Sequence, residues 1–549
     1  MNIENKTFNI FCLVLLCGIT IYGADLRFTN LSKPNFSDDE YFHLFTAQSL
    51  LENGKPALPG GTVYKKGLPF TFLVSQTYKV LGINEFSSRF WSAIFGVLSI
   101  LLIYWITAQM INRPVAVIAA FLLAVSPFSI IFSRMTRMYS MNQFFYLLTL
   151  FIFYQVLENG YSSGSFSETL FPSKNYKKIF LLTVGFSLFL LTFYSHRLSL
   201  FMIIGLFAYC CFHLLWNSYK HGFHSSIPSR YVRCSVLILL FALATILIPD
   251  LRTKLIHTLL WVPEWAKTHR GSFHYYRWFL SDQYSALVWM TLPGIFFLLK
   301  RRFVPGTYLI CSFCVPFIIL SFIPWKSERY LFYIFPLFLM IISTGAYYIL
   351  TVPALKMAEW AVARWNKWPF DKVHAIVGIA CLFAIGILNA FTPGFTLATK
   401  LYDMEQGEFA GIRYSSWKQI ADFIKQRSSE NDAIISSRTA PLKYYLGRVD
   451  YSIHRMAQAE ILRVRNQDRN GNFYDYSTGA LYLQDKKDLE EAVNRNKTVW
   501  MVIESSLLSG RKNRLSKDEI AYIHSKFRTM STVDNENIVI LKYEQSEKQ

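Results

Sequence analysis

Three consecutive acidic residues give this chain its clearest candidate for chemistry. Asp38, Asp39 and Glu40 directly precede a helix-like stretch at 41–52. Free backbone amides at the start of a helix favour negative charge, which would account for one of the acids. Three acids exceed what capping requires. A carboxylate here could act as general base toward an acceptor hydroxyl, and the pair Asp39 and Glu40 could alternatively hold a divalent cation of unknown identity.

Cationic residues at intervals along the chain supply a complementary charge. Lysine and arginine can surround a phosphate and stabilise the charge that a phosphate leaving group gains as its bond breaks. The candidates are Lys65, Lys66, Arg89, Arg134, Arg137, Lys326 and Arg329. Two alternatives stay open. Arg89 could simply anchor the start of a membrane span, and charges at a membrane boundary are often only solvated anchors.

The segments that must position these residues are mostly apolar. The chain has 549 residues, of which 52% are hydrophobic and 17% charged, and this excludes a disordered chain and an ordinary soluble enzyme. Apolar runs of bilayer length predict about eleven membrane helices, the first of them a retained span rather than a signal peptide. The runs lie at roughly 8–23, 90–108, 114–132, 141–157, 179–194, 198–216, 234–249, 284–299, 305–323, 330–350 and 374–392.

The distribution of basic residues predicts an orientation. If the first connection lies outside, every inside connection carries lysine or arginine, as at 300–302. This explains much of the net charge of +20 without nucleic acid. The acidic motif and the candidate cations then meet at the outer face of the plasma (inner) membrane. An odd number of spans also places the C-terminal tail outside.

The tail differs in composition from the rest of the chain. Strands and helices alternate along it, which predicts a small extracytoplasmic α/β domain at 408–549, structural or facing the acceptor. The predicted helices are 415–426 and 486–496, and the predicted strands are 432–437, 479–483, 499–504 and 538–543. The remainder, 1–400, is the membrane domain, with its first outer loop at 25–88. No glycine-rich phosphate loop occurs in the tail, so no nucleotide cofactor is expected.

The eight cysteines lie inside or at the edge of apolar runs, so no disulfide framework is expected. Cys311 and Cys314 form a CxxC pair that is interpreted as packing within a buried helix.

An ordered set of short motifs resembles the dolichyl-phosphate-mannose protein mannosyltransferase-like superfamily. Its relatives include the lipid A aminoarabinose transferases and proteins of glycosyltransferase family 39 type. The motifs are Asp39-Glu40-Tyr41, Ala47-Gln48-Ser49-Leu50, Tyr64-Lys65-Lys66-Gly67-Leu68-Pro69, Glu85-Phe86-Ser87-Ser88-Arg89, Ser126-Pro127, Ser133-Arg134, Arg137-Met138-Tyr139, and Lys326 with Glu328-Arg329-Tyr330. They extend over most of the chain.

The resemblance implies a GT-C architecture and transfer of a sugar from a polyprenyl-phosphate carrier, usually with inversion. By this likeness Asp39, with Glu40 beside it, matches the catalytic aspartate, Lys66 the lysine of the second loop motif, and Arg329-Tyr330 the late-span motif. Tyr64 and Tyr139 complete the candidate binding set. Two departures argue against an aminoarabinose transferase within this class: Gly67-Leu68-Pro69 follows Lys66 where Pro-Pro-Leu is frequent, and Phe42 stands where some lipid A enzymes carry arginine.

The sequence thus predicts a polytopic α-helical membrane protein, GT-C-like, with about eleven spans and a C-terminal extracytoplasmic α/β domain. Its predicted function is glycosyl transfer, with Asp39 as base and the donor phosphate among Lys66, Arg89, Arg137 and Arg329. The acceptor, a lipid, a glycan or a protein, stays open. A flippase for lipid-linked sugars and a non-catalytic envelope-assembly subunit are the alternatives. Charges at one face and no clear internal repeat disfavour a transporter.

Overall fold

The structure is a computed structural model in which the chain divides into two compact units. It describes residues 3–158, 174–221, 229–247, 249, 252–253, 271–324, 326–365, 407–409, 412–414, 416–453, 472–510, 515–533 and 537–545. We call residues 1–29, 91–134 and 138–402 the membrane unit, and residues 30–90, 135–137 and 403–549 the α/β unit. The first loop thus groups with the tail, whereas the sequence-based division placed it with the membrane helices.

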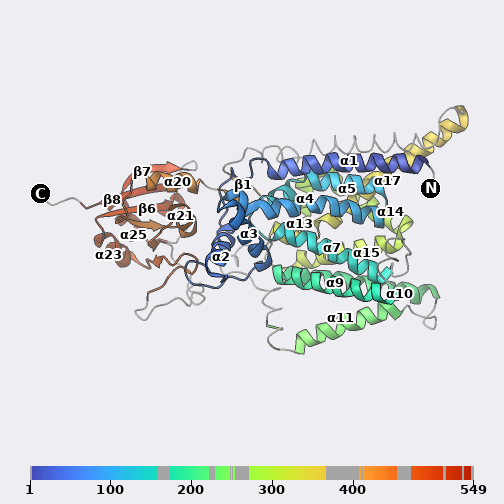
Figure 1. The fold of residues 1–549 in the computed structure, drawn as a ribbon, viewed down its shortest axis with the longest axis horizontal. Coiled ribbons are helices and arrows are strands. Elements are labelled where there is room, and N and C mark those ends of the chain that lie inside the picture. The colour runs from blue at the N-terminus through green and yellow to red at the C-terminus, as the bar shows by residue number, and fades with distance from the viewer. Residues whose placement is uncertain are drawn as a thin grey trace. The chain divides into compact units, whose positions relative to one another are not determined.

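The membrane unit is built of helices. Within it α1 packs on α5, α5 on α17, α7 on α9, and α10 on α15 (Figure 1). The α-helices are α1 (Ile3–Phe28), α4 (Glu85–Met110, its first residues in the α/β unit), α5 (Arg113–Val125), α6 (Pro127–Ser133), α7 (Tyr139–Glu158), α9 (Lys174–Ser195), α10 (Phe201–His221), α11 (Ser229–Leu247), α13 (Tyr275–Tyr284), α14 (Thr291–Arg301), α15 (Phe303–Phe322), α16 (Glu328–Leu331) and α17 (Phe335–Trp365). Two 3-10 helices join them, η1 (Arg197–Leu200) and η3 (Ser285–Met290).

Seven helices of the described part are long and apolar enough to cross a membrane, or eight if the bent pair α5–α6 is one span. Two predicted spans differ from single straight helices. The run at 114–132 is this pair, bent by 59°, and the run at 284–299 consists of η3 and α14. Pro127 and Pro293 explain both breaks, because proline has no N–H to bond the carbonyl four residues earlier. The run at 374–392 lies outside the described residues, so the count of eleven stays a prediction.

A buried arginine satisfies the helix break between α5 and α6. Without an N–H at Pro127, the carbonyl of Leu123 has no helical donor. Arg27, fully buried on α1, supplies one: its Nη2 donates to Leu123 O at 3.1 Å and its Nη1 to Ala124 O at 2.9 Å. Nη2 also donates to the Ser129 hydroxyl at 2.9 Å. Arg27, a charged residue in the apolar helix α1, therefore has a structural role: it supplies hydrogen-bond donors to the break between α5 and α6.

A second arginine, next to the α5–α6 break, bonds the end of α1. Arg134, directly after α6, donates from Nη1 to the carbonyls of Leu26 at 3.2 Å, Arg27 at 3.3 Å and Thr29 at 2.7 Å, at the C-terminal end of α1. The last carbonyls of a helix have no partners within it, and a cation there also complements the helix dipole. The two arginines therefore join α1 to the α5–α6 break in both directions.

The α/β unit contains a six-stranded sheet with the strand order β5-β4-β3-β6-β8-β7. Strands β5, β4, β3 and β6 are parallel, and β8 is antiparallel to both β6 and β7. The strands are β1 (Gly407–Phe409), β2 (Ile412–Tyr414), β3 (Ala433–Ser436), β4 (Tyr451–Ser452), β5 (Leu481–Tyr482), β6 (Thr498–Glu504), β7 (Arg528–Val533) and β8 (Ile538–Glu544). The helices are α2 (Glu40–Asn53), α3 (Leu68–Leu81), α20 (Trp417–Lys425), α21 (Thr439–Leu446), α23 (Lys486–Asn494), α24 (Ser505–Leu508) and α25 (Lys517–Lys526).

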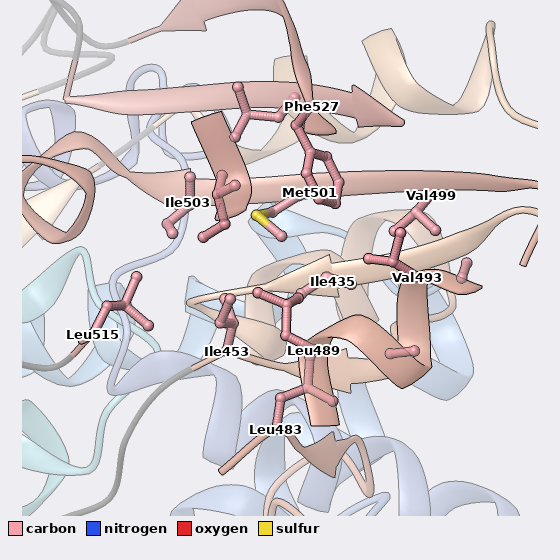
Figure 2. Packing of buried hydrophobic residues seen from close by; sticks show 14 of the residues in the cluster. Ile435, Ile453, Leu483, Leu489, Val493, Val499, Met501, Ile503, Leu515 and Phe527 are labelled. Carbon is pink, nitrogen blue, oxygen red and sulfur yellow. The ribbon is translucent and has the colours of Figure 1, made fainter. Parts of the chain in front are cut away.

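The side chains of the central strand β6 alternate between the two faces of the sheet, and each face carries a hydrophobic core. Successive side chains of a strand point to opposite faces. Val499, Met501 and Ile503 of β6 pack with α23 and α25 (Figure 2), whereas Trp500 and Val502 pack with α20 and α21. The predicted tail elements are confirmed, including strands β3, β5, β6 and β8 and helices α20 and α23.

The helix break yields a prediction for Arg27→Met. This change leaves the Leu123 and Ala124 carbonyls without their donor, at a cost of about 1–3 kcal/mol for each buried group. We expect a clearly lower melting temperature in detergent, measured by intrinsic fluorescence. The matched control is Arg302→Met, at an exposed arginine of the same unit. Equal melting temperatures of Arg27→Met and wild type would refute the capping role.

Candidate active site

Each of the three consecutive acids at the start of α2 faces a different arginine of the α/β unit. The arginines come from segments far apart in the sequence. The pairs are Asp38 with Arg438 at 2.5 Å, Asp39 with Arg137 at 3.4 Å, and Glu40 with Arg89 at 3.2 Å. The acids differ in burial: the side chains of Asp38 and Asp39 are 54% and 47% exposed, and that of Glu40 is fully buried. Asp38 and Asp39 are therefore accessible to other molecules, whereas Glu40 is not.

Glu40 directs both carboxylate oxygens at protein donors. Its Oε1 accepts from the backbone N–H of Thr136 at 2.6 Å and from Arg89. Its Oε2 accepts from the backbone N–H of Ser37 at 2.8 Å and the Ser37 hydroxyl at 3.0 Å. A buried carboxylate is tolerated when it is paired and hydrogen-bonded in this way. Glu40 therefore joins three segments of the chain.

Arg89, on the first turns of α4, fixes the loop before α2. Its Nη1 donates to the carbonyls of Leu31 at 3.0 Å and Pro34 at 2.8 Å, and its Nη2 to that of Asn35 at 2.9 Å. Its guanidinium also lies 4.6 Å from the ring centroid of Phe36. Arg89 is fully buried. Its donors are directed at the protein, unlike the phosphate contact predicted for it.

Asp39 is held from two sides yet keeps an accessible carboxylate. Arg137 is 1% exposed; its Nη1 donates to the Asp39 backbone carbonyl at 2.6 Å and its Nη2 lies 3.4 Å from Asp39 Oδ2. Asp39 occupies the N-cap position of α2, but its side chain makes no capping hydrogen bond. A general base must be oriented and within reach of the proton that it accepts, and this carboxylate is both held by Arg137 and accessible to solvent.

The predicted residues Tyr64 and Lys66 lie near His43, which the sequence analysis did not single out. His43, one turn along α2, is buried and its Nδ1 bonds the Thr71 hydroxyl at 2.7 Å. Burial, followed by the charges of Arg137 and Lys66, holds the pKa of His43 well below its usual value, so the ring stays neutral near pH 7. Lys66 is exposed. The Tyr64 ring meets the His43 ring edge-on at 5.5 Å.

The remaining predicted residues belong to the membrane unit, and two of them cap helices. Arg134 caps α1, as described above. Lys326 Nζ donates to the carbonyls of Leu320 at 3.0 Å and Ile323 at 2.5 Å at the end of α15, and burial lowers its pKa. The Arg329 guanidinium lies 5.7 Å from the Tyr330 ring centroid, and both residues are half-buried. Tyr139 is buried, with its ring against Phe132 and His196.

The tail contributes residues that the sequence did not indicate. Arg438 was not among the candidates, because nothing in residue spacing connects position 438 with position 38. Aromatic packing accompanies the ion pair: Phe36 meets Tyr444 edge-on at 5.4 Å, and Tyr41 meets it at 5.9 Å.

A metal-binding cluster is not found within the described ranges, where no group of three or more His, Cys, Asp or Glu side chains could hold an ion. Of the predicted pair, Glu40 has both oxygens engaged by protein donors. The cysteines in the described part are free, as expected.

Comparison with known proteins gives a match to one family over part of the chain. Residues 54–249 match the family model described as dolichyl-phosphate-mannose-protein mannosyltransferase. An uncharacterised protein of Aquifex aeolicus (strain VF5) is 28% identical over 151 residues, which cover 26% of this chain and 29% of that protein. The matched part thus spans less than a third of this curated relative.

Solved structures share the fold. ArnT from Cupriavidus metallidurans in the apo state aligns with a TM-score of 0.60 and 12% identity, over 98% of both chains. The same protein bound to undecaprenyl phosphate aligns with a TM-score of 0.57. The archaeal oligosaccharyltransferase AglB from Archaeoglobus fulgidus, in complex with an inhibitory peptide and a dolichol-phosphate, aligns with a TM-score of 0.60 and 14% identity, over 90% of this chain and 70% of AglB.

These findings confirm the predicted resemblance and the predicted fold class, a GT-C-like helical membrane protein with a C-terminal α/β domain. The matched family is one of glycosyltransferases, the enzyme class that the sequence predicts. With its apolar helices and this fold, the chain is a multi-pass membrane protein.

The buried ion pair leads to a stability prediction. Arg89→Met leaves the Glu40 carboxylate buried without its cation, and we expect a loss of about 3–5 kcal/mol in the free energy of unfolding. Adding Glu40→Gln should recover part of this loss, because no buried charge then remains. Lys418→Met is the control: it breaks the more exposed Lys418–Glu85 pair and should cost about 0–1 kcal/mol. Denaturation in detergent measures all four proteins, and an Arg89→Met effect no larger than that of Lys418→Met would contradict the prediction.

Proposed function

We propose that this chain, whose residues 54–249 match the dolichyl-phosphate-mannose-protein mannosyltransferase family, is a membrane glycosyltransferase that uses a polyprenyl-phosphate-linked sugar. The transfer takes place at the extracytoplasmic face. The observation that carries the proposal is the state of Asp39, whose carboxylate is held by Arg137 and is 47% exposed. The lipid phosphates in the ArnT and AglB structures support the choice of donor.

The proposed reaction is a single displacement at the anomeric carbon. The Asp39 carboxylate accepts the proton of an acceptor hydroxyl, whose oxygen forms the new bond to the sugar. The bond from the anomeric carbon to the phosphate oxygen breaks, and the polyprenyl phosphate leaves with the electron pair. Charge builds up on the sugar ring as in glycoside hydrolysis, and on the leaving phosphate. Arg137 keeps the carboxylate oriented throughout.

The cationic residues divide into two groups in this proposal. Lys66 is exposed and matches the lysine of the family's second loop motif, so it is assigned to the donor phosphate. Arg329, Tyr330 and Tyr139 are assigned to the donor from the family motifs that contain them. Arg89, Arg134 and Lys326 are assigned structural roles, because their donors bond backbone carbonyls. Glu40 likewise positions the motif and does not take the proton.

Asp39→Asn tests the proposed base. The amide keeps the size of the side chain but cannot accept the proton, so transfer should fall by about 10²–10⁴-fold with an unchanged melting temperature. Purified protein is incubated with undecaprenyl-phosphate-linked labelled sugars and a lipid extract of the envelope. Asp488→Asn, at the exposed start of α23, is the control. Near-normal turnover of both Asp39→Asn and Asp39→Ala would exclude the assigned base, and movement of the donor without transfer would favour a flippase.

Lys66→Met tests the donor contact. Removal of a cation from the phosphate should raise KM for the lipid-linked donor by about tenfold and weaken binding of undecaprenyl phosphate in parallel. Lys55→Met, a change at another exposed lysine of the same loop, serves for comparison. If the two variants bind undecaprenyl phosphate equally well, Lys66 does not contact the donor phosphate.

A further inference from the structure

One guanidinium from the tail connects the acidic motif to the end of the sheet. Arg438 Nε and Nη2 lie 3.0 Å and 2.9 Å from Glu504 Oε1, and its Nη1 lies 2.5 Å from Asp38 Oδ2. The planar fork of arginine can bridge two carboxylates in fixed geometry, which lysine cannot do. Asp38 is the residue directly before the proposed base, so this contact acts on the backbone that carries Asp39.

The backbone of Arg438 is itself fixed. Arg438 follows β3 at the N-cap of α21; its N–H donates to the Ser436 hydroxyl at 3.0 Å and its carbonyl accepts from that hydroxyl at 2.8 Å. The neighbouring Ser437 N–H donates to Val502 O at 3.0 Å. Glu504 is the last residue of β6, which is parallel to β3. Both partners thus stand at the carboxyl ends of adjacent parallel strands, the usual place for functional side chains in such sheets.

The loop that Arg438 reaches is held beside this contact by other tail residues. The Asn35 side-chain oxygen accepts from the Lys418 N–H at 3.2 Å. The Phe36 and Tyr41 rings pack against Tyr444 of α21. These contacts attach the segment before α2 to the tail, and the Asp38–Arg438 pair is the contact nearest to Asp39 along the chain.

We infer that Arg438 is a positioning residue of the proposed transfer reaction, and this inference rests on the proposed function. Arg438 fixes Asp38, while Arg137 fixes the carbonyl and carboxylate of Asp39. Together they hold the Asp38-Asp39 backbone in the orientation that presents the Asp39 carboxylate to an acceptor. The tail therefore takes part in catalysis without touching the reacting atoms.

Because the side chains of this pair are exposed, an effect on the transfer rate can be distinguished from an effect on folding stability. Arg438 and Asp38 are 40% and 54% exposed, and such pairs contribute little to stability. Asp38→Asn removes the carboxylate of this pair and leaves the contact between Arg438 and Glu504 in place, so it should leave the melting temperature unchanged. A displaced base, by contrast, lowers the rate steeply, because a shift of about 1 Å can cost about 100-fold.

The experiment compares Arg438→Gln, Asp38→Asn and the double variant with wild type in the transfer assay. We expect each single variant to lower kcat by about tenfold or more at unchanged donor KM, and the double variant to lose no more than either. Arg438→Lys should retain intermediate activity. Arg495→Gln removes an exposed arginine that pairs with Glu491 on α23 of the same unit, and it should behave like wild type.

The possible results separate the two proposals. Three results would each overturn the positioning role alone: full activity of Arg438→Gln, additive losses in the double variant, or an activity loss of Asp38→Asn that is matched by a fall in its melting temperature. An inactive wild type would overturn the proposed function and this inference with it.

Discussion

The pairing of three neighbouring acids with three distant arginines is the interaction on which the site depends. Consecutive carboxylates repel one another, and a neighbouring guanidinium offsets this repulsion, which matters most for the buried Glu40. Glu40 meets Arg89 in the interior, Asp39 meets Arg137 at the boundary, and Asp38 meets Arg438 nearer to solvent. Because each arginine comes from a different segment, the motif gathers the first loop, the 135–137 turn and the tail around one helix start. The difference in burial also distinguishes Glu40, which is buried and structural, from Asp39, whose carboxylate is accessible.

Arginine has a second use in this molecule, as a donor to backbone carbonyls. Arg27 serves the break between α5 and α6, Arg134 the end of α1, and Arg89 the loop before α2. In an apolar environment an unpaired carbonyl is costly, and one guanidinium can satisfy several at once. Several charges that stand at helix ends in the sequence are therefore part of the scaffold. On this basis the proposed function assigns the donor phosphate to Lys66 and a structural role to Arg89.

The sequence predicted four strands and two helices of the tail, most of the membrane helices and the family resemblance, because hydrophobic periodicity and ordered motifs are local signals. It missed α21, α24, α25, β4 and β7. Pro127 and Pro293 marked the two helix breaks, but a run of apolar residues hides a bend. The partners of each charge could not be predicted. Arg89 and Lys66 look alike in sequence, and only the position of nearby carbonyls distinguishes a buried clamp from an exposed cation. The link between positions 38 and 438 had no sequence signal, since it depends on tertiary contact across 400 residues.

The grouping of residues 30–90 with residues 403–549 bears on how relatives of this protein can diverge. Phe36, Tyr41 and Asn35 are matched to Tyr444 and Lys418, so a tail acquired from another protein would meet a loop shaped for a different surface. Recombination or chimera construction should therefore succeed only when both segments are exchanged together, even though more than 300 residues separate them in the sequence.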